Sequence, residues 1–256
     1  MPLEPAAASS FPSEETPATL ALPPITTPTH GTGGTFSVAC STRIAAAPLI
    51  CLDLVLKSEQ YPSWNKFCRK CTIDQQPRPD TTTPGTGIPG LPDLGSDYLK
   101  LGTKFTFDVH MNPDDDTSAT GRATALEVSV LEHIDEEEVM DLSGSSGGPA
   151  GRQTMTRAGW RVAWKTRTSS PLMPGWMLRS ERVQEFVEVD TPFGPRDEPE
   201  TAYRCWETFY GVLAPVVRMA VGGQLVNGFN VWMRDLKKRA EELERSEGAF
   251  APSSSA

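Results

Sequence analysis

The chain has 256 residues, and 24 Lys and Arg against 33 Asp and Glu leave a formal charge of -9. An acidic chain without a basic stripe repels phosphate, which argues against direct binding to nucleic acid. No apolar run approaches the ~18 residues that a membrane-spanning helix needs. The first Lys or Arg is Arg43, so the start of the chain lacks the basic residues of a secretory or mitochondrial leader. We therefore expect an acidic globular protein of the cytoplasm without a membrane span.

Proline marks two segments as poor candidates for packing. The 23 prolines are about 9% of the chain, against a typical ~5%. Residues 1–34 carry seven of them and residues 74–96 carry five. Segments of this composition bury too little apolar surface to offset the entropy of ordering. We expect a disordered tail at 1–34, whose first 30 residues can be removed without unfolding the domain. The domain itself should span 35–246, with a disordered insertion at 74–96 and a disordered end at 247–256.

The rest of the chain shows strand and helix patterns in a simple order. Phe36–Ile44 alternates with period two and is typical of a strand. Pro48 opens a short helix that reaches Leu56, and a second helical piece spans Tyr61–Asn65. Further strand candidates are separated by loops rich in Gly, Pro and Asp, as in antiparallel hairpins. These candidates are Lys104–Met111, Thr124–Ile134, Thr154–Lys165, Met177–Val189 and Thr201–Tyr210.

The C-terminal part changes to a helical period. Apolar residues recur every three or four positions from Val217 to Leu243, which predicts one amphipathic helix of about 25–30 residues. A run of antiparallel strands followed by one long helix predicts an α+β fold, in which a curved sheet wraps around the helix. Such a sheet leaves room for a cavity. Gly222, Gly223 and Gly228 in the helix either leave space for a ligand or permit close packing.

Six short motifs occur along the chain in a characteristic order. They are Ser41-Thr42-Arg43-Ile44, Tyr61-Pro62-Ser63-Trp64-Asn65, Arg161-Val162-Ala163-Trp164-Lys165, Leu178-Arg179-Ser180-Glu181-Arg182-Val183, Trp206-Glu207-Thr208-Phe209 running into Gly211, and Asp235-Leu236-Lys237-Lys238. Together they resemble the START-like helix-grip superfamily, also called SRPBCC or Bet v 1-like, over roughly residues 35–245. The likeness is greatest to its polyketide cyclase/dehydrase branch in versions common in fungi. It implies a pocket between the sheet and the C-terminal helix that holds an apolar or amphipathic small molecule.

Strand parity predicts the polar centre of this pocket. If Phe186 and Phe209 point inward, an antiparallel register places inward-facing Arg182 opposite Glu207. A guanidinium there can polarise a ligand carbonyl or hold an enolate, and Glu207 can orient it or act as a base. We therefore predict that Arg182 and Glu207 are catalytic. The competing interpretation is a structural cross-strand ion pair, or a register slip that leaves both groups in solvent.

The same parity predicts a ligand-binding wall that is largely aromatic. Gln184 and Tyr203 are its polar members, and each is alternatively satisfied by its neighbours in the sheet. The predicted ligand-binding residues are Trp160, Trp164, Gln184, Phe186, Tyr203, Phe107 and, from the long helix, Leu225.

Metal and cofactor sites are not predicted. The five cysteines form an odd set, and the C-x-x-C of Cys68 and Cys71 lacks a second pair of zinc ligands. On an extended segment these two residues should point to opposite faces. His110 and His133 fall on the outward parity of their strands and are expected at the surface.

Three functions fit this pattern. The first is a cofactor-independent cyclase or isomerase that folds a polyketide-like intermediate in an aromatic pocket and steers proton transfer with one or two polar groups. The second is a non-catalytic carrier of a lipid, quinone or other apolar ligand. The third is an interaction protein similar to the chaperone activators of the superfamily, with a vestigial pocket. A real pocket is favoured over the third function, and the first is our preferred hypothesis.

Overall fold

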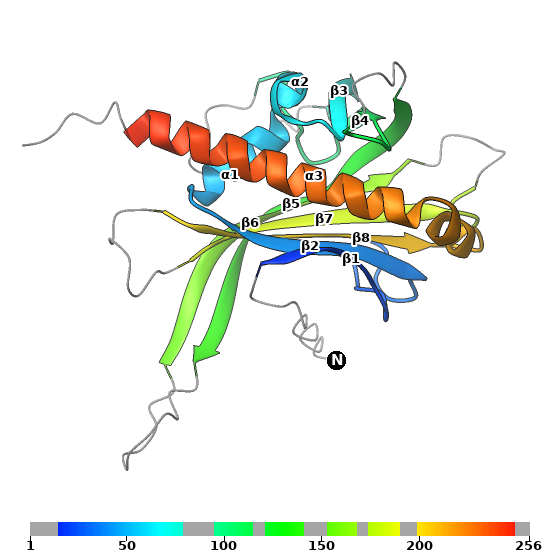
Figure 1. Ribbon diagram of the computed structural model, residues 1–256, viewed down its shortest axis with the longest axis horizontal. Helices are drawn as coiled ribbons and strands as arrows, with labels where there is room; N and C mark the ends of the chain where they lie inside the picture. The colour runs from blue at the N-terminus through cyan, green and yellow to red at the C-terminus, as the bar shows by residue number, and fades with distance from the viewer. Residues whose placement is uncertain are drawn as a thin grey trace, which may run out of the picture.

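The computed structural model describes residues 15–78, 95–114, 121–140, 153–167, 174–189 and 199–248. These residues form one antiparallel sheet that curves around a long C-terminal helix (Figure 1). The strand order across the sheet is β1-β2-β8-β7-β6-β5-β4-β3. The strands are β1 (Thr16–Ala21), β2 (Phe36–Ile44), β3 (Cys68–Gln75), β4 (Lys104–Val109), β5 (Arg122–Met140), β6 (Gln153–Thr166), β7 (Arg179–Glu188) and β8 (Thr201–Tyr210). The helices are α1 (Pro48–Leu56), α2 (Tyr61–Trp64) and α3 (Ala214–Gly248), with a 3-10 turn η1 at Ser58–Gln60.

The α+β helix-grip architecture predicted from the sequence is confirmed. β2 and β8 have the predicted bounds, and they lie side by side although they are the first and last of the predicted strands. α1 and α2 follow β2 directly, as expected. α3 crosses the concave side of the sheet (Figure 1), where it packs on β2 and α1. The apolar stripe of the helix and the inward faces of the strands therefore meet in one core.

Strand β3 was not predicted, because its sequence CRKCTIDQ mixes charged and polar residues with few apolar ones. It forms one edge of the sheet, where charged side chains discourage pairing with other chains. Its last two residues, Asp74 and Gln75, overlap the predicted insertion at 74–96. Gln76 also belongs to the folded domain, since its side-chain amide donates to the carbonyls of Ser96 and Tyr98 at 3.0 and 2.8 Å. The insertion is thus narrower than predicted, and its positions 79–94 lie outside the described residues.

The predicted end of the N-terminal tail at residue 34 is wrong. β1 pairs with β2 from Thr19↔Ala39 to Ala21↔Ser37. The Ala18 N–H also donates to Oδ1 of Asn230 in α3 at 2.8 Å. Composition misled here because a strand added to a sheet edge is held by backbone hydrogen bonds, which need no large apolar side chains. At the other end of the chain, α3 continues to Gly248, just past the predicted boundary at 246. Residues 1–14 and 249–256 lie outside the described residues.

The segment between β1 and β2 covers the convex face of the sheet. Ile25 packs against Trp206 in a small apolar cluster on that face. The Trp206 Nε1–H donates to the carbonyl of Thr26 at 3.0 Å. Oε2 of the buried Glu181 accepts the backbone N–H groups of Thr29 and His30 at 2.9 and 3.2 Å. Burial alone raises the pKa of Glu181, but these and neighbouring hydrogen bonds bring the pKa below its ordinary value. The convex face is therefore closed by polar anchors as much as by apolar contact.

The concave face is covered unevenly along α3. From Phe229 onward, which we call the C-terminal half of the helix, the side chains of Phe229, Trp232, Leu236 and Ala240 are fully buried, and Leu243 near the end is partly buried. In the N-terminal half, the apolar stripe continues through Val217 and Leu225, which are only partly buried. No helix among the described residues is both long and apolar enough to cross a membrane.

The glycines of α3 play different parts. A Cβ at Gly228 would lie 2.2 Å from Cε2 of Phe67, so this glycine permits close packing and does not leave space for a ligand. A Cβ at Gly222 would make ordinary contact with Leu20 of β1 at 3.6 Å. At Gly223 no atom lies within 4 Å of that position, which faces open space.

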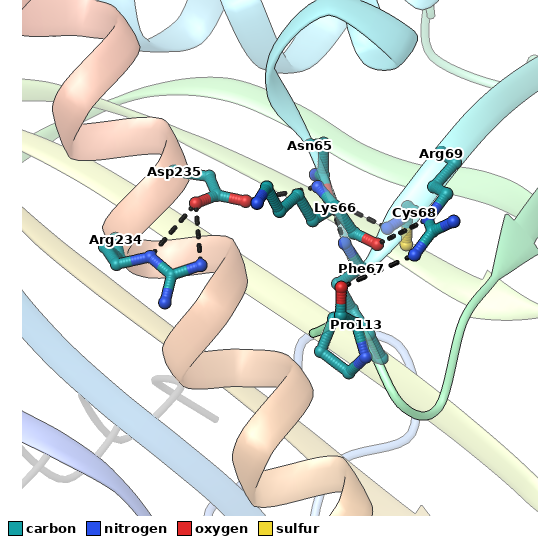
Figure 2. Close-up of polar contacts among 8 residues, drawn as sticks. All are labelled: Asn65, Lys66, Phe67, Cys68, Arg69, Pro113, Arg234 and Asp235. Carbon is teal, nitrogen blue, oxygen red and sulfur yellow. Dashed lines mark hydrogen bonds and ion pairs between the residues drawn. The ribbon is translucent and has the colours of Figure 1, made fainter. Parts of the chain in front are cut away.

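A polar junction holds the start of β3 against α3 (Figure 2). Oδ1 of Asn65 accepts the backbone N–H groups of Phe67 and Cys68 at 3.0 and 2.7 Å. Oδ2 of Asp235 in α3 accepts the N–H of Lys66 at 3.1 Å. The residue that ends the Tyr61–Asn65 motif is therefore a structural turn former, and it fixes the position from which Phe67 reaches Gly228.

Candidate functional site

The predicted register between β7 and β8 is observed. Arg182 lies opposite Glu207 and Gln184 lies opposite Cys205. On the other side of β7, Trp164 of β6 is the partner of Arg182. Directly opposed residues share a face of the sheet, so Arg182 and Glu207 form a polar rung on the concave surface.

Arg182 is a buried cation inside an aromatic layer. Its guanidinium carbon lies 4.2 Å from the ring centroids of both Phe229 and Trp232 of α3. Its Nε–H donates to Sγ of Cys205 at 3.3 Å, and only 4% of the residue is exposed. Its terminal nitrogen Nη2 has no hydrogen-bond partner among the described residues. Burial disfavours the charge, but the surrounding Cys205, Tyr203 and Glu207 more than offset this, so the pKa of Arg182 stays raised. A charged donor is thus held ready for an acceptor.

Glu207 shares this rung but does not pair with Arg182. Within the part of the chain that the structure describes, which includes both residues, no hydrogen bond or ion pair joins Arg182 to Glu207. Instead, the hydroxyl of Ser180 donates to Oε1 of Glu207 at 2.7 Å. The structural ion pair considered as the competing interpretation is therefore not formed. Burial raises the pKa of Glu207, and the charge of Arg182 and the Ser180 hydrogen bond offset only part of this. A carboxyl group in this state suits proton transfer to or from a ligand.

Gln184 connects the sheet to α3. Its Oε1 accepts hydrogen bonds from the hydroxyl of Tyr203 at 2.7 Å and from Nε1 of Trp232 at 3.1 Å. Its amide nitrogen Nε2 is buried and has no partner among the described residues. Gln184 and Arg182 are two positions apart on one strand face, so two unpartnered N–H donors lie on the same side of β7.

The predicted aromatic wall consists of side chains that pack on one another. The ring of Trp164 contacts those of Phe107 and Trp232 with centroids 5.7 and 6.1 Å apart. Phe186 packs on Tyr203 at 5.3 Å. All five side chains are buried. They therefore form part of the packed core between the sheet and α3 rather than an open surface.

Cys205 is a further member of the polar centre. It lies opposite Cys40 of β2 and accepts the Nε–H of Arg182. Burial disfavours the thiolate, but the Cys40 thiol, the charge of Arg182 and the hydroxyl of Tyr203 together lower the pKa of Cys205. The side-chain acceptor that Arg182 contacts is therefore the sulfur of Cys205 and not the carboxyl group of Glu207.

Trp160 is the predicted wall residue that lines a cavity. The cavity has a volume of about 260 Å³ and is bounded by Trp160, His133, Glu188 and the start of α1. His133 is at the surface as predicted, but on the other face of the sheet from the one its parity indicated, because it lies opposite Trp160 with ring centroids 5.0 Å apart. A β-bulge between Val128 and Val130 inverts the parity of β5 beyond it. The His133 side chain is nevertheless 47% exposed, as a surface histidine should be.

His110 is not at the surface, contrary to the prediction. It is 5% exposed, its Nε2 lies 3.0 Å from Oδ2 of Asp108, and its backbone N–H donates to the Phe67 carbonyl. Strand parity did not apply, because β4 ends at Val109.

The C-x-x-C cysteines also depart from the expected arrangement. Cys68 and Cys71 are both buried, because a register irregularity between Cys68 and Lys70 brings them to the same side of β3. Burial raises the pKa of Cys68 to about 12. All five cysteines are free. Within the described ranges, no three His, Cys, Asp or Glu side chains are placed to share a metal ion.

Near the N-terminal half of α3, several side chains on the concave side of the sheet are only partly buried. Leu178, Glu207 and Leu225 face the concave side, yet each keeps part of its surface accessible. Leu178 and Leu225 pack on the margin of the core rather than inside it. A small molecule reaching Glu207 from this side would meet Arg182 on the same rung.

A curved antiparallel sheet gripping a long C-terminal helix, with a polar rung beneath that helix, defines a START-like helix-grip protein. No family model matches the sequence. The chain is 30% identical over 197 residues to the "Oxopyrrolidines biosynthesis cluster protein O" of Penicillium oxalicum. The aligned region covers 77% of this chain and 81% of the relative. The chain belongs to the family of that fungal protein.

Two solved structures are similar at low sequence identity. One is a hypothetical protein of Helicobacter pylori, with 14% identity, a TM-score of 0.44 and coverage of 79% of this chain and 86% of its own. The other is a START superfamily protein of Mycobacterium smegmatis, with 15% identity, a TM-score of 0.40 and coverage of 81% and 98%. The assignment of the fold rests on the strand order and on α3, not on these likenesses.

Sequence reasoning missed the part that α3 plays in the site. Trp232 and Phe229 enclose the guanidinium of Arg182, although Trp232 was recognised only as a member of the apolar stripe. Cys205 was not assigned a role, although the register that pairs Arg182 with Glu207 also brings Cys205 opposite Gln184. The available signal was the register itself, which puts a sulfur beside a buried arginine.

Proposed function

We propose that this protein binds an apolar small molecule carrying an acceptor oxygen beneath the N-terminal half of α3, and acts on it in secondary metabolism. The observation that carries the proposal is the unpartnered Nη2 of the buried Arg182, with the unpartnered Nε2 of Gln184 on the same strand face. An unsatisfied buried donor costs about 1–3 kcal/mol, and a carbonyl, carboxylate or enolate oxygen would remove that cost. The name of the fungal relative, a biosynthesis cluster protein, supports the metabolic setting.

The preferred reaction is a cofactor-independent cyclisation or isomerisation of a polyketide-like intermediate. Arg182 would hold the oxygen on which negative charge develops, as a preformed donor in a site that excludes water. Glu207, whose pKa is raised by burial, would move a proton to or from the adjacent carbon. The aromatic side chains of α3 and the sheet would restrict the ligand to a reactive conformation. The alternative is a carrier that uses the same anchor without turnover.

Binding can be tested with two fluorescent probes of similar shape. Anilinonaphthalene sulfonate carries an anionic group, whereas N-phenyl-naphthylamine is neutral. Arg182→Met should weaken binding of the sulfonate by roughly 10- to 100-fold, the value of a charge-assisted hydrogen bond, and leave the neutral probe nearly unchanged. Equal effects on both probes would show that Arg182 is not an anchor, and thermal melts of the variant would exclude unfolding as the cause.

Turnover separates the enzyme from the carrier. Native mass spectrometry of the purified protein would first identify a co-purified molecule, and its precursor would then be supplied as substrate. For an enzyme, Glu207→Gln should keep ligand affinity and lose about 10²–10³ in rate. If the variant converts the substrate at the original rate, Glu207 is not catalytic. If neither protein changes the substrate beyond its spontaneous rate, the carrier function replaces the cyclase.

A further inference from the structure

An exposed apolar surface surrounds the start of α3. The side chains of Trp176, Val212, Val216 and Met219 are 63, 64, 59 and 85% exposed. Val216 and Met219 are three positions apart in α3 and so share one face, and Val212 lies in the turn that leads into the helix. The N–H of Val212 donates to the carbonyl of Trp176 at 3.4 Å, which places the tryptophan loop beside this stripe. We call these four residues the cap surface.

β1 extends the cap surface. Leu20 and Leu22 are 42% and 60% exposed, and Leu20 lies within contact distance of Gly222 in α3. Seven large hydrophobic side chains are exposed in the described part of the chain, and six of them lie on the cap surface and this extension. The seventh, Leu101, precedes β4. Isolated exposed side chains are ordinary, but a cluster of this size marks an interaction site.

The charges near the cap surface are basic, although the whole chain carries a charge of -9. Arg218 is the single charged residue between Gly211 and Met233. Arg179 follows the tryptophan loop, and its guanidinium lies over the ring of Tyr210 at 5.3 Å. Residues 16–36 contain no Asp or Glu. This end of an acidic protein therefore combines apolar side chains with arginines and lacks carboxylates among the segments that form it.

We propose that the cap surface docks on a lipid bilayer that contains anionic phospholipids. Protruding Trp, Leu and Met side chains insert at the boundary between headgroups and acyl chains, and arginines at their margin pair with phosphate groups. A bilayer requires no shape complementarity, which suits side chains that project outward. A two-fold contact between copies of this chain through the cap surface would bury Arg218 against a surface whose segments supply no carboxylate.

Docking through this surface would place the N-terminal half of α3, and the partly buried side chains near it, at the membrane. The cap surface begins at the N-terminus of α3, and the partly accessible Leu225 lies in the same half of that helix. Apolar molecules partition into bilayers, so this orientation would bring their source to the entrance. The inference itself does not depend on the proposed function, because it rests on the exposed side chains and their charges.

Vesicle sedimentation tests the inference with the full chain and no added ligand. The protein should bind vesicles of phosphatidylcholine mixed with phosphatidylglycerol, and binding should weaken in high salt or with phosphatidylcholine alone. The double variant Trp176→Ser/Met219→Ser and the single variant Arg218→Glu should each reduce partition by about tenfold or more. Leu101→Ser is the matched control, since it removes an exposed apolar side chain elsewhere and should bind as the original chain does.

Three results would overturn the inference. Absence of binding to the anionic vesicles is the first. Equal loss of binding in the cap variants and in Leu101→Ser is the second, because it would indicate non-specific adhesion. The third is a protein that sediments as a dimer and becomes a monomer when Trp176 and Met219 are changed, since a second copy would then cover the surface. Circular dichroism and melts of each variant show that a lost interaction is not lost folding.

Discussion

The two halves of α3 lie on the same sheet but meet it differently. The C-terminal half buries Phe229, Trp232 and Leu236 completely among aromatic partners. The N-terminal half leaves Leu225 partly accessible above the sheet and carries Met219, which is 85% exposed, on its outer side. The apolar stripe runs through both halves. The difference between them therefore lies in how many side chains of the sheet and of the short helices pack on each half, and not in the sequence pattern of the helix itself.

This difference separates stability from function along one helix. The closed half holds the fold through ring contacts, and in the proposed function the open half is where a ligand would approach the polar rung. Arg182 lies at the boundary, because its guanidinium is enclosed by Phe229 and Trp232 while Glu207 opposite keeps an accessible edge. A rigid aromatic layer of this kind can hold a charged donor in one position, which a flexible pocket cannot do.

The largest expected effect tests the closed half directly. Trp232→Ala should lower the free energy of unfolding by about 3–5 kcal/mol, because it removes a fully buried ring that contacts Trp64 and Trp164. Leu225→Ala, in the open half, should lower it by about 1 kcal/mol or less. Urea denaturation of both variants measures the comparison. Equal losses at the two positions would mean that both halves are packed alike.

The second effect concerns the convex face, which the N-terminal segment covers. Removing residues 1–30 should lower the melting temperature by about 5–10 °C, contrary to the sequence-based expectation, because it deletes β1 and exposes Glu181 and Trp206. A chain without residues 1–14 keeps every described contact and is the matched control. If the two truncated chains melt together, the convex cover adds nothing to stability.

Two glycines of α3 should respond with opposite signs. Gly228→Ala places a methyl group against Phe67 and should cost about 1–3 kcal/mol through overpacking. Gly223→Ala faces open space and should stabilise the protein by about 0.5–1 kcal/mol, since alanine favours the helix. Thermal melts of the two variants compare a closed and an open position five residues apart. A gain at Gly228 would show that space remains beneath the helix there.

The smallest effect is a pH dependence at the open side. The pKa of Glu207 is raised in the folded state, so between its ordinary and raised values the folded chain binds more protons than the unfolded chain. Stability from this group is therefore present at low pH and lost as the pH rises through that window. Glu207→Gln keeps the acceptor for Ser180 and removes the titration. Its melting temperature should exceed that of the original chain by a few degrees at neutral pH, and the gap should close in acid; a constant gap would contradict the raised pKa.

Local pattern determined most of the fold. The alternation of Phe36–Ile44 and Thr201–Tyr210 and the helical period after Val217 depend on backbone geometry that each segment carries itself. The register of Arg182 with Glu207 also followed from sequence, because β7 and β8 are joined by one connection and pair without a bulge. The same reasoning failed for His133 and for Cys71, where an irregularity in the pairing changes the parity.

Tertiary structure decided what each side chain meets. An edge strand such as β1 needs only backbone partners, so its composition resembles that of a disordered tail until β2 is beside it. Arg182 was placed on the correct face, but its neighbours Cys205, Phe229 and Trp232 come from β8 and α3, and only the packed fold brings them together. The exposed fraction of each side chain on α3 likewise depends on how the helix packs on the sheet. The stripe on α3 was therefore visible in the sequence, whereas the half of it that remains open was not.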